Sequence, residues 1–185
     1  MDQSLLVTTS SEGLQPLGTA AQRSFELVSA TVEARLGADH AALLAAPVAE
    51  LHGDKIDWHA AKPGRAERFA ELTEDEQSAL RRQLGELVAD IRTEADALSE
   101  STDSDQQRLG EALRHAIEIP GEEMIWAVRE ANGALSPVLV HWAWVRDEAR
   151  AVRGVLSRME PRPVAPTVLA AAPGALVAER AGAHP

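Results

Sequence analysis

The sequence predicts an α+β protein with a four-stranded, mostly antiparallel sheet built from two β-hairpins. Two pairs of short apolar or alternating runs, each pair separated by turn residues, indicate the two hairpins. Apolar positions at helical spacing, with capping signals beside them, indicate several amphipathic helices. With 185 residues, of which 45% are hydrophobic, the chain can bury one core of ordinary size. We expect a helical hairpin and one further N-terminal helix to pack on the sheet.

Composition divides the chain into three parts. Residues 1–18 mix Ser, Thr, Gly and Pro with little periodicity, so we expect a flexible arm. Residues 19–160 carry the periodic segments and are predicted to form a single α+β domain. Residues 161–185 are rich in Pro and Ala and are expected to be a disordered tail. The N-terminus has no basic, leader-like region, and no apolar run reaches about 18 residues. We therefore expect a cytoplasmic protein with no transmembrane segment.

The first elements are a helix and a strand pair. The helix is predicted at about 19–36 and should stop at Gly37. Two short strands follow, at 41–46 and 55–59, joined by a loop that contains His52-Gly53-Asp54. The alanine-rich segment 41–46 also fits a helical turn. The apolar positions that predict the helix are Phe25, Val28, Val32 and Leu36.

A helical hairpin is predicted next. Thr73 and Glu76 have the spacing of a capping box, in which each side chain accepts a hydrogen bond from the other residue's backbone amide. A helix should therefore cover 74–98, break at 101–105 and be followed by a second helix over about 105–117. One apolar seam of the first helix contains Leu80, Leu84, Leu87, Ile91 and Leu98.

The second hairpin is rich in tryptophan. Segments 124–129 and 137–145 are apolar and are separated by Asn132-Gly133, a strong signal for a two-residue type I′ turn. That turn would place Ala127 opposite Val138, and it would make both faces of the hairpin apolar and covered by protein.

A fourth helix is predicted after the tryptophan hairpin, over Asp147–Met159. Its apolar positions recur at helical spacing, and Pro161 would end it.

The charge is strongly negative and unevenly placed. The formal net charge is −11, and the segment Glu71–Glu123 has 15 acidic and 5 basic residues, a net of −10. This disfavours nucleic acid as a partner, because neutralising phosphates is a main source of affinity for it. The acidic residues can form a solvated helical face or dock a basic partner surface. Cysteine is absent, so disulfides and cysteine-based zinc sites are excluded.

No motif in the sequence identifies a reaction. GxSxG, SxxK, GxxxxGK and GxGxxG are all absent, and the histidines lack the HxH or HExxH spacing of a metal site. We therefore expect no catalytic residue, no cofactor and no metal, and a protein that is not an enzyme. The alternative is a small metal-dependent hydrolase that uses Asp54, Asp57, His59 and His141 of the two hairpins.

Candidate partner-binding residues come from the tryptophans and the acidic helix. Four of the six aromatic residues are tryptophans, which can pack in the core, anchor a protein partner or line a ligand pocket. We predict partner contacts at Trp144 and Trp142, and at Asp90 and Glu94 on the acidic flank of the helical seam.

Two segments together resemble a known family. They are Gly53-Asp54-Lys55-Ile56-Asp57-Trp58-His59-Ala60, followed by Gly64 and the capped helix from Thr73, and Pro137-Val138-Leu139-Val140 with Trp142. This pattern resembles the soluble N-terminal region of SrfA-like and large OmpA-type proteins from bacterial virulence-associated operons. His59 stands where that family usually has tyrosine, and the tryptophan expected before the long helix is missing. The resemblance covers about residues 37–145.

The resemblance implies a non-enzymatic structural or adaptor subunit of a bacterial multi-protein assembly. Its partners would be other protein subunits, and self-association and a peripheral association with the envelope are both open. The resemblance implies no catalytic residue.

Overall fold

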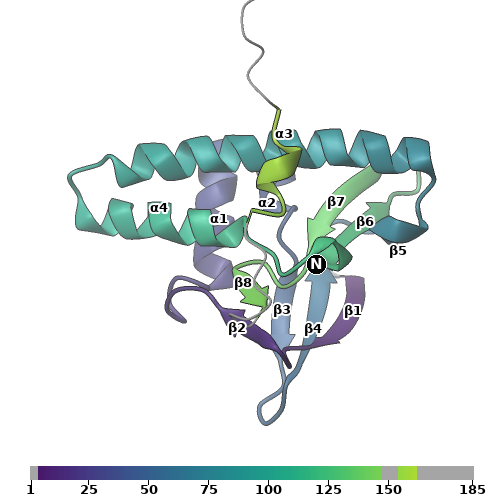
Figure 1. The fold of residues 1–185 in the computed structure, drawn as a ribbon, viewed down its shortest axis with the longest axis horizontal. Helices are drawn as coiled ribbons and strands as arrows, with labels where there is room; N and C mark the ends of the chain where they lie inside the picture. Colours follow the sequence, from purple (N-terminus) through teal and green to yellow (C-terminus); the bar gives the residue numbers. More distant parts are fainter. Residues whose placement is uncertain (1–3, 147–153, 162–185) are drawn as a thin grey trace, which may run out of the picture.

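The computed structural model describes residues 4–146 and 154–161 and shows an α+β fold (Figure 1). Within these residues there are four α-helices and three small antiparallel sheets of three, two and three strands. The predicted α+β class is confirmed, but the strands form these separate sheets instead of one four-stranded sheet. One hydrophobic core includes residues from Leu6 to Leu156. The helices are α1 (Phe25–Leu36), α2 (Ala38–Ala41), α3 (Glu74–Ser99) and α4 (Ser104–Ala116).

The helical hairpin α3–α4 lies across one side of the molecule (Figure 1). The Thr73 hydroxyl accepts from the Glu76 amide at 3.2 Å, and the Glu76 carboxylate accepts from the Thr73 amide at 3.3 Å, so the predicted capping box is present. The two helices approach closely at Gly110, where an added Cβ would lie 2.7 Å from the Ala95 carbonyl oxygen. This part of the fold is as predicted.

The segment from residue 19 to residue 49 differs from its prediction. Helix α1 begins at Phe25, because Ser24 is its N-cap, and it ends at Gly37, whose φ is 109°. Helix α2 uses the start of the alanine-rich segment, so the helical alternative holds there. The strand of this region is β3 (Ala46–Ala49), which starts where the predicted strand ends. Alanine favours a helical turn when no branched side chain supports a strand.

Residues 4–16, expected as a flexible arm, belong to two sheets. Strand β1 (Ser4–Ser10) pairs antiparallel with β4 (Lys55–Ala60), which in turn pairs with β3. Strand β2 (Leu14–Pro16) pairs with β8 (Trp144–Arg146), near the other end of the described chain. Both partners are distant in sequence, so no local pattern shows the pairing.

The third sheet contains β5 (Arg65–Arg68), β6 (Ile125–Arg129) and β7 (Leu135–Leu139). Its hairpin is present, but the predicted register is wrong by one residue, since Ala127 pairs with Pro137. The Glu130 amide donates to the Ala134 carbonyl at 2.9 Å and closes a three-residue loop, in which Gly133 has a φ of 86°. A glycine in the left-handed region at the end of a three-residue loop is a common hairpin connection.

The strand predicted over 137–145 stops at Leu139. His141 and Ala143 have φ values of 49° and 65°, in the left-handed region, so the backbone turns and Trp144 starts β8 in another sheet. Leu139 also forms an isolated parallel bridge with Leu44, which joins the third sheet to the segment that leads into β3.

The predicted fourth helix falls largely outside the described residues, as does the predicted tail from residue 162. The described end forms the 3-10 helix η4 (Ser157–Met159), which is not the predicted α-helix. It packs on α3, where Gly85 leaves space for the Met159 carbonyl and Arg92 donates to Glu160 at 2.6 Å. Within 4–146 and 154–161, no helix is long and apolar enough to cross a membrane.

Candidate functional site

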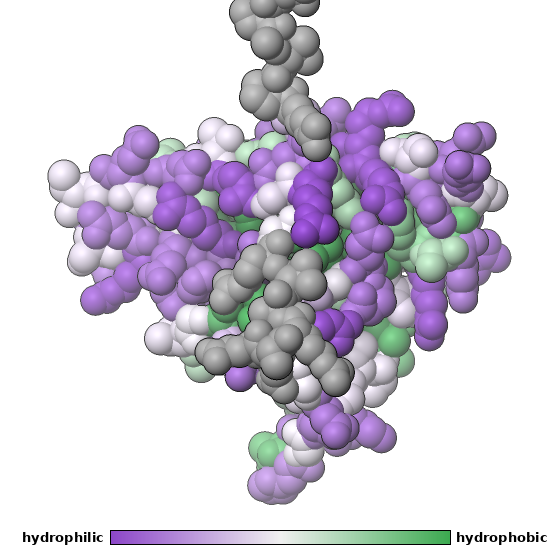
Figure 2. Space-filling model, viewed as in Figure 1, coloured by the Kyte–Doolittle hydropathy of each residue, from purple (hydrophilic) through white to green (hydrophobic). Residues whose placement is uncertain are grey.

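The predicted acidic contact residues have partners within the chain: Asp90 a hydrogen bond and Glu94 an ion pair. Asp90 lies 2.8 Å from the His40 imidazole, and Glu94 lies 2.9 Å from the Arg35 guanidinium. These pairs hold α3 against α1 and α2. The outward surface over α3 and α4 is hydrophilic (Figure 2). Partner binding by Asp90 and Glu94 stays a prediction.

The two predicted tryptophan anchors differ in exposure. Trp142 is 2% exposed, and its indole nitrogen donates to the Ala45 carbonyl at 2.8 Å, so it is a core residue in this conformation. Trp144 is partly exposed and lies edge-on against His141. Of the two, only Trp144 offers surface to a partner.

The four groups of the hydrolase alternative are not brought together. Along β4, Ile56, Trp58 and Ala60 are buried, and alternation places Asp57 and His59 on the other face. The His141 ring contacts the Trp58 ring in a tilted arrangement with centroids 5.0 Å apart, so it lies on the buried face. Among the described residues, no group of three His, Asp or Glu side chains is placed to hold a metal ion.

His141 instead joins three segments of the fold. Its Nε2 lies 2.6 Å from the Thr9 hydroxyl of β1, and the Trp58 indole of β4 donates to the same hydroxyl at 2.8 Å. An indole nitrogen can only donate, so the Thr9 hydroxyl accepts from Trp58. Which of Thr9 and His141 donates in their contact depends on the imidazole tautomer, because a hydroxyl can both donate and accept.

The environment of His141 keeps it neutral. Its side chain is fully buried, and burial lowers the pKa of His141 to about 4. Its Nδ1 has no hydrogen-bond partner within the described part of the chain. A threonine next to a histidine has the spacing of a nucleophile and a base, but no described carboxylate orients this imidazole. The geometry therefore supports a role in fixing the strands. Sequence reasoning missed Thr9 because it lies in the segment expected as an arm.

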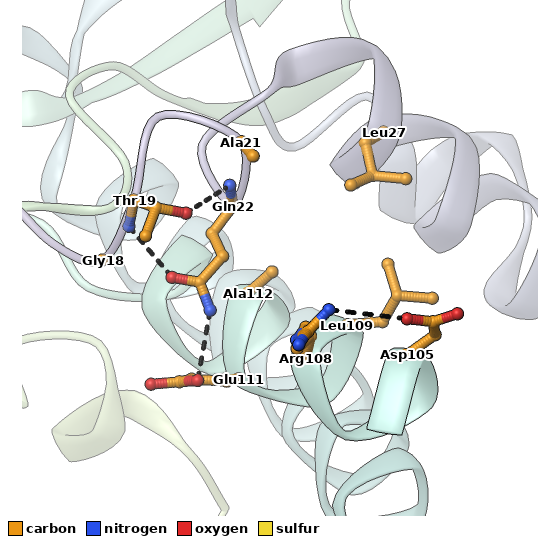
Figure 3. A pocket seen from close by; sticks show the side chains of 10 residues that line it. All are labelled: Gly18, Thr19, Ala21, Gln22, Leu27, Asp105, Arg108, Leu109, Glu111 and Ala112. Carbon is orange, nitrogen blue, oxygen red and sulfur yellow. Dashed lines mark hydrogen bonds and ion pairs between the residues drawn. The ribbon is translucent and has the colours of Figure 1, made fainter. Parts of the chain in front are cut away.

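A groove of about 800 Å³ lies between the loop before α1 and the exposed side of α4 (Figure 3). Leu27 of α1 and Leu109 of α4 face it from opposite sides, and Leu27 is 44% exposed. Its floor includes Ala112. The lining residues are Gly18, Thr19, Ala21, Gln22, Leu27, Asp105, Arg108, Leu109, Glu111 and Ala112.

The polar groups of the groove lie at its rim. The Gln22 side chain accepts from the Thr19 amide at 2.9 Å and donates to Glu111 at 3.1 Å, which ties the loop to α4 (Figure 3). Arg108 and Asp105 form an exposed pair at 3.6 Å. An apolar strip is thus left open between charged edges. No sequence signal indicated it, because Leu27 lies off the apolar positions of its helix.

Comparison of this chain with protein-family models, with curated proteins and with solved structures gives no match. The resemblance to SrfA-like proteins therefore stays a prediction, and any function has to be argued from the surfaces of the molecule.

Proposed function

We propose that this protein is a non-enzymatic structural or adaptor subunit of a bacterial multi-protein assembly, and that it binds a partner protein in the groove between α1 and α4. The observation that carries the proposal is the open groove of about 800 Å³ with leucines on both sides. Leu27 keeps 44% of its surface exposed there. An apolar strip with a polar rim is the usual anatomy of a protein interface.

The shape and charge of the groove favour an amphipathic helix as the bound element. Helices in grooves place apolar side chains at i, i+3 and i+4 into the strip and leave charged side chains at the rim. The rim here has Asp105 and Glu111 against Arg108, and the chain has a net charge of −11. A partner helix with basic flanks would therefore be attracted. Trp144 is proposed as a further contact, and a cytoplasmic or peripheral envelope location belongs to the same proposal.

The test is isolation of the native complex with wild-type and Leu27→Asp protein, followed by mass spectrometry. We expect Leu27→Asp to lose the partner while its melting temperature stays near that of the wild type, because 44% of Leu27 is already exposed. Leu51→Asp is the matched control, since Leu51 is 91% exposed in the β3–β4 loop, away from the groove. A wild-type protein without any stable partner, or a partner retained by Leu27→Asp, would contradict the proposal.

A further inference from the structure

Two of the edge strands, β5 and β1, differ in charge. Strand β5 is at the edge of its sheet, and three of its four residues, Arg65, Glu67 and Arg68, are charged. Strand β1 is also an edge strand, and none of its seven residues is charged. Charged side chains protect sheet edges against pairing with other chains. By this criterion β5 is protected and β1 is open to a further strand.

The backbone of β1 alternates between its neighbour and its free edge. Lys55 of β4 uses its carbonyl to accept from the Glu50 amide on the β3 side, at 3.1 Å, so it does not bond Ser10, which lies opposite on β1. Asp57, two residues farther along β4, lies opposite Thr8, and its backbone groups point to the same side as those of Lys55. In an antiparallel ladder, the backbone groups of Thr8 and Ser10 therefore point away from β4. They are available to an added strand.

A cleft of about 470 Å³ runs beside this edge. Val7, Thr8 and Thr9 all line it, so it follows the strand over three residues. The far wall is built by residues 68–70 and 122–126. Its apolar members are Phe69, Ala70, Met124, Ile125 and Trp126, with Val140 beside them.

The cleft selects among possible occupants. Neighbouring strands lie about 4.8 Å apart, so an extended segment added beside β1 would run along the cleft. Glu122 and Glu123 line the cleft and are paired with Arg81 and Arg146, so it is the net charge of −11 that disfavours an acidic segment. Arg68 stacks over Trp126 at 5.5 Å and holds that indole in the wall, where it can receive an apolar side chain.

We infer that the free edge of β1 and the adjoining cleft bind an extended, non-acidic segment of a partner protein as an added β-strand, with an apolar side chain against Trp126. Main-chain hydrogen bonds to Thr8 and Ser10 would supply affinity, and the cleft would supply specificity. The inference rests on the proposed function in taking a protein as the ligand. It uses a surface separate from the groove between α1 and α4.

The experiment selects linear peptides from a displayed random library against the full-length protein and measures their affinity by calorimetry. Thr8→Pro removes the outward amide donor, and edge strands accept proline where the amide faces solvent. Thr8→Ala is the matched control, because it also loses the hydroxyl contact with Asp57 but keeps the amide. We expect Thr8→Pro to weaken binding about tenfold or more, since a hydrogen bond is lost and the ring obstructs the edge. Thr8→Ala should bind as the wild type does.

Amide hydrogen exchange gives a second readout that does not depend on a variant folding. Bound peptide should protect the amides of Thr8 and Ser10 and leave those of β5 unchanged. Peptides that bind without this protection, or a library that yields no binder, would overturn the inference. So would a concentration-dependent dimer that Thr8→Pro abolishes, which would make a second copy the occupant. Loss of the native partner in Leu27→Asp is independent of each of these results, so the two proposals can fail separately.

Discussion

The helical pair α3–α4 and the segment from Val140 to Arg146 are both part of one core, but they are held in different ways. The pair packs through a seam of aliphatic side chains that recur every three or four residues. The segment pairs with β2 over its last three residues, and before them it is held by single contacts, with the Val140 amide donating to the Met124 carbonyl and the Ala143 amide to the Glu118 carbonyl. It also has two residues in the left-handed region. Polar substitutions should therefore destabilise the helical pair most. The stability of the segment should depend on its backbone conformation and on the protonation of His141.

The largest expected effect comes from breaking the seam. Leu84 is fully buried at its centre, so Leu84→Asp places an unpaired charge in the core and should lower the free energy of unfolding by about 4 kcal/mol or more. Leu87 is only partly buried, so Leu87→Asp should cost less. Urea denaturation measures both changes. Leu51→Asp, on a loop, should leave the free energy of unfolding nearly unchanged. Equal decreases for Leu51→Asp and Leu84→Asp would contradict a stabilising role of the seam.

The second prediction tests the segment through His141. Its pKa in the folded protein is about 4, against 6.5 for an ordinary histidine, because burial disfavours the charged ring. The unfolded chain therefore binds the proton first as the pH falls. The stabilisation by this neutral histidine is complete above about pH 6.5 and is lost progressively toward pH 4. Between pH 7 and pH 4.5 the free energy of unfolding should fall by about 2 to 3 kcal/mol from this group.

His141→Asn is the variant that isolates this effect. Asparagine tolerates the left-handed conformation better than most residues and does not titrate. We expect it to lower stability at pH 7 and to flatten the slope between pH 7 and pH 4.5, as measured by urea denaturation at several pH values. The lowered pKa values of Glu67 and Glu76, caused chiefly by their hydrogen bonds from Arg129, act at lower pH. If the pH dependence of the free energy of unfolding is unchanged in the variant, His141 is not its cause.

The smallest predicted effect tests the backbone strain at Ala143, which the helical pair does not have. Ala143 has a φ of 65°, which costs a residue with a Cβ about 1 kcal/mol and costs glycine little. Ala143→Gly should therefore raise the free energy of unfolding by up to about 1 kcal/mol, in spite of the greater freedom of the unfolded chain. Ala127→Gly, at a buried site in β6, is the control and should be destabilising. Thermal denaturation measures both changes. A lower stability of Ala143→Gly would contradict the backbone strain inferred at Ala143.

The helical pair could be predicted because its signals are local. Thr73 and Glu76 are three residues apart, and each seam residue lies within one or two turns of the next. The existence of the β6–β7 hairpin was also predictable, but its register depended on whether Asn132 took a positive φ. It does not, and its side chain instead accepts from the Ala134 amide at 3.0 Å. One extra loop residue then shifts every pair of the ladder.

The candidate sites were less predictable, because exposure depends on what other elements cover. The sequence predicted Trp142 as an interface residue, but its indole nitrogen donates a hydrogen bond to the Ala45 carbonyl in the core. Nothing in the sequence distinguishes Leu27 from the other aliphatic residues, but in the structure it is 44% exposed beside α4. Thr9 lies 132 residues from His141, and nothing local to either residue indicates that they touch.

The pairing of β2 with β8 has a consequence for the order of events on the ribosome. Leu14 pairs with Arg146, so β2 leaves the exit tunnel long before its partner β8. Helices α3 and α4 contact each other across a short connection and can form while synthesis continues, because such contacts close quickly. Strand β1 can pair with β4 once residue 60 has emerged, but β2 has no partner until β8 follows. The β2–β8 sheet therefore forms only after residue 146 has emerged, later than the helical pair, and β2 stays unpaired until then.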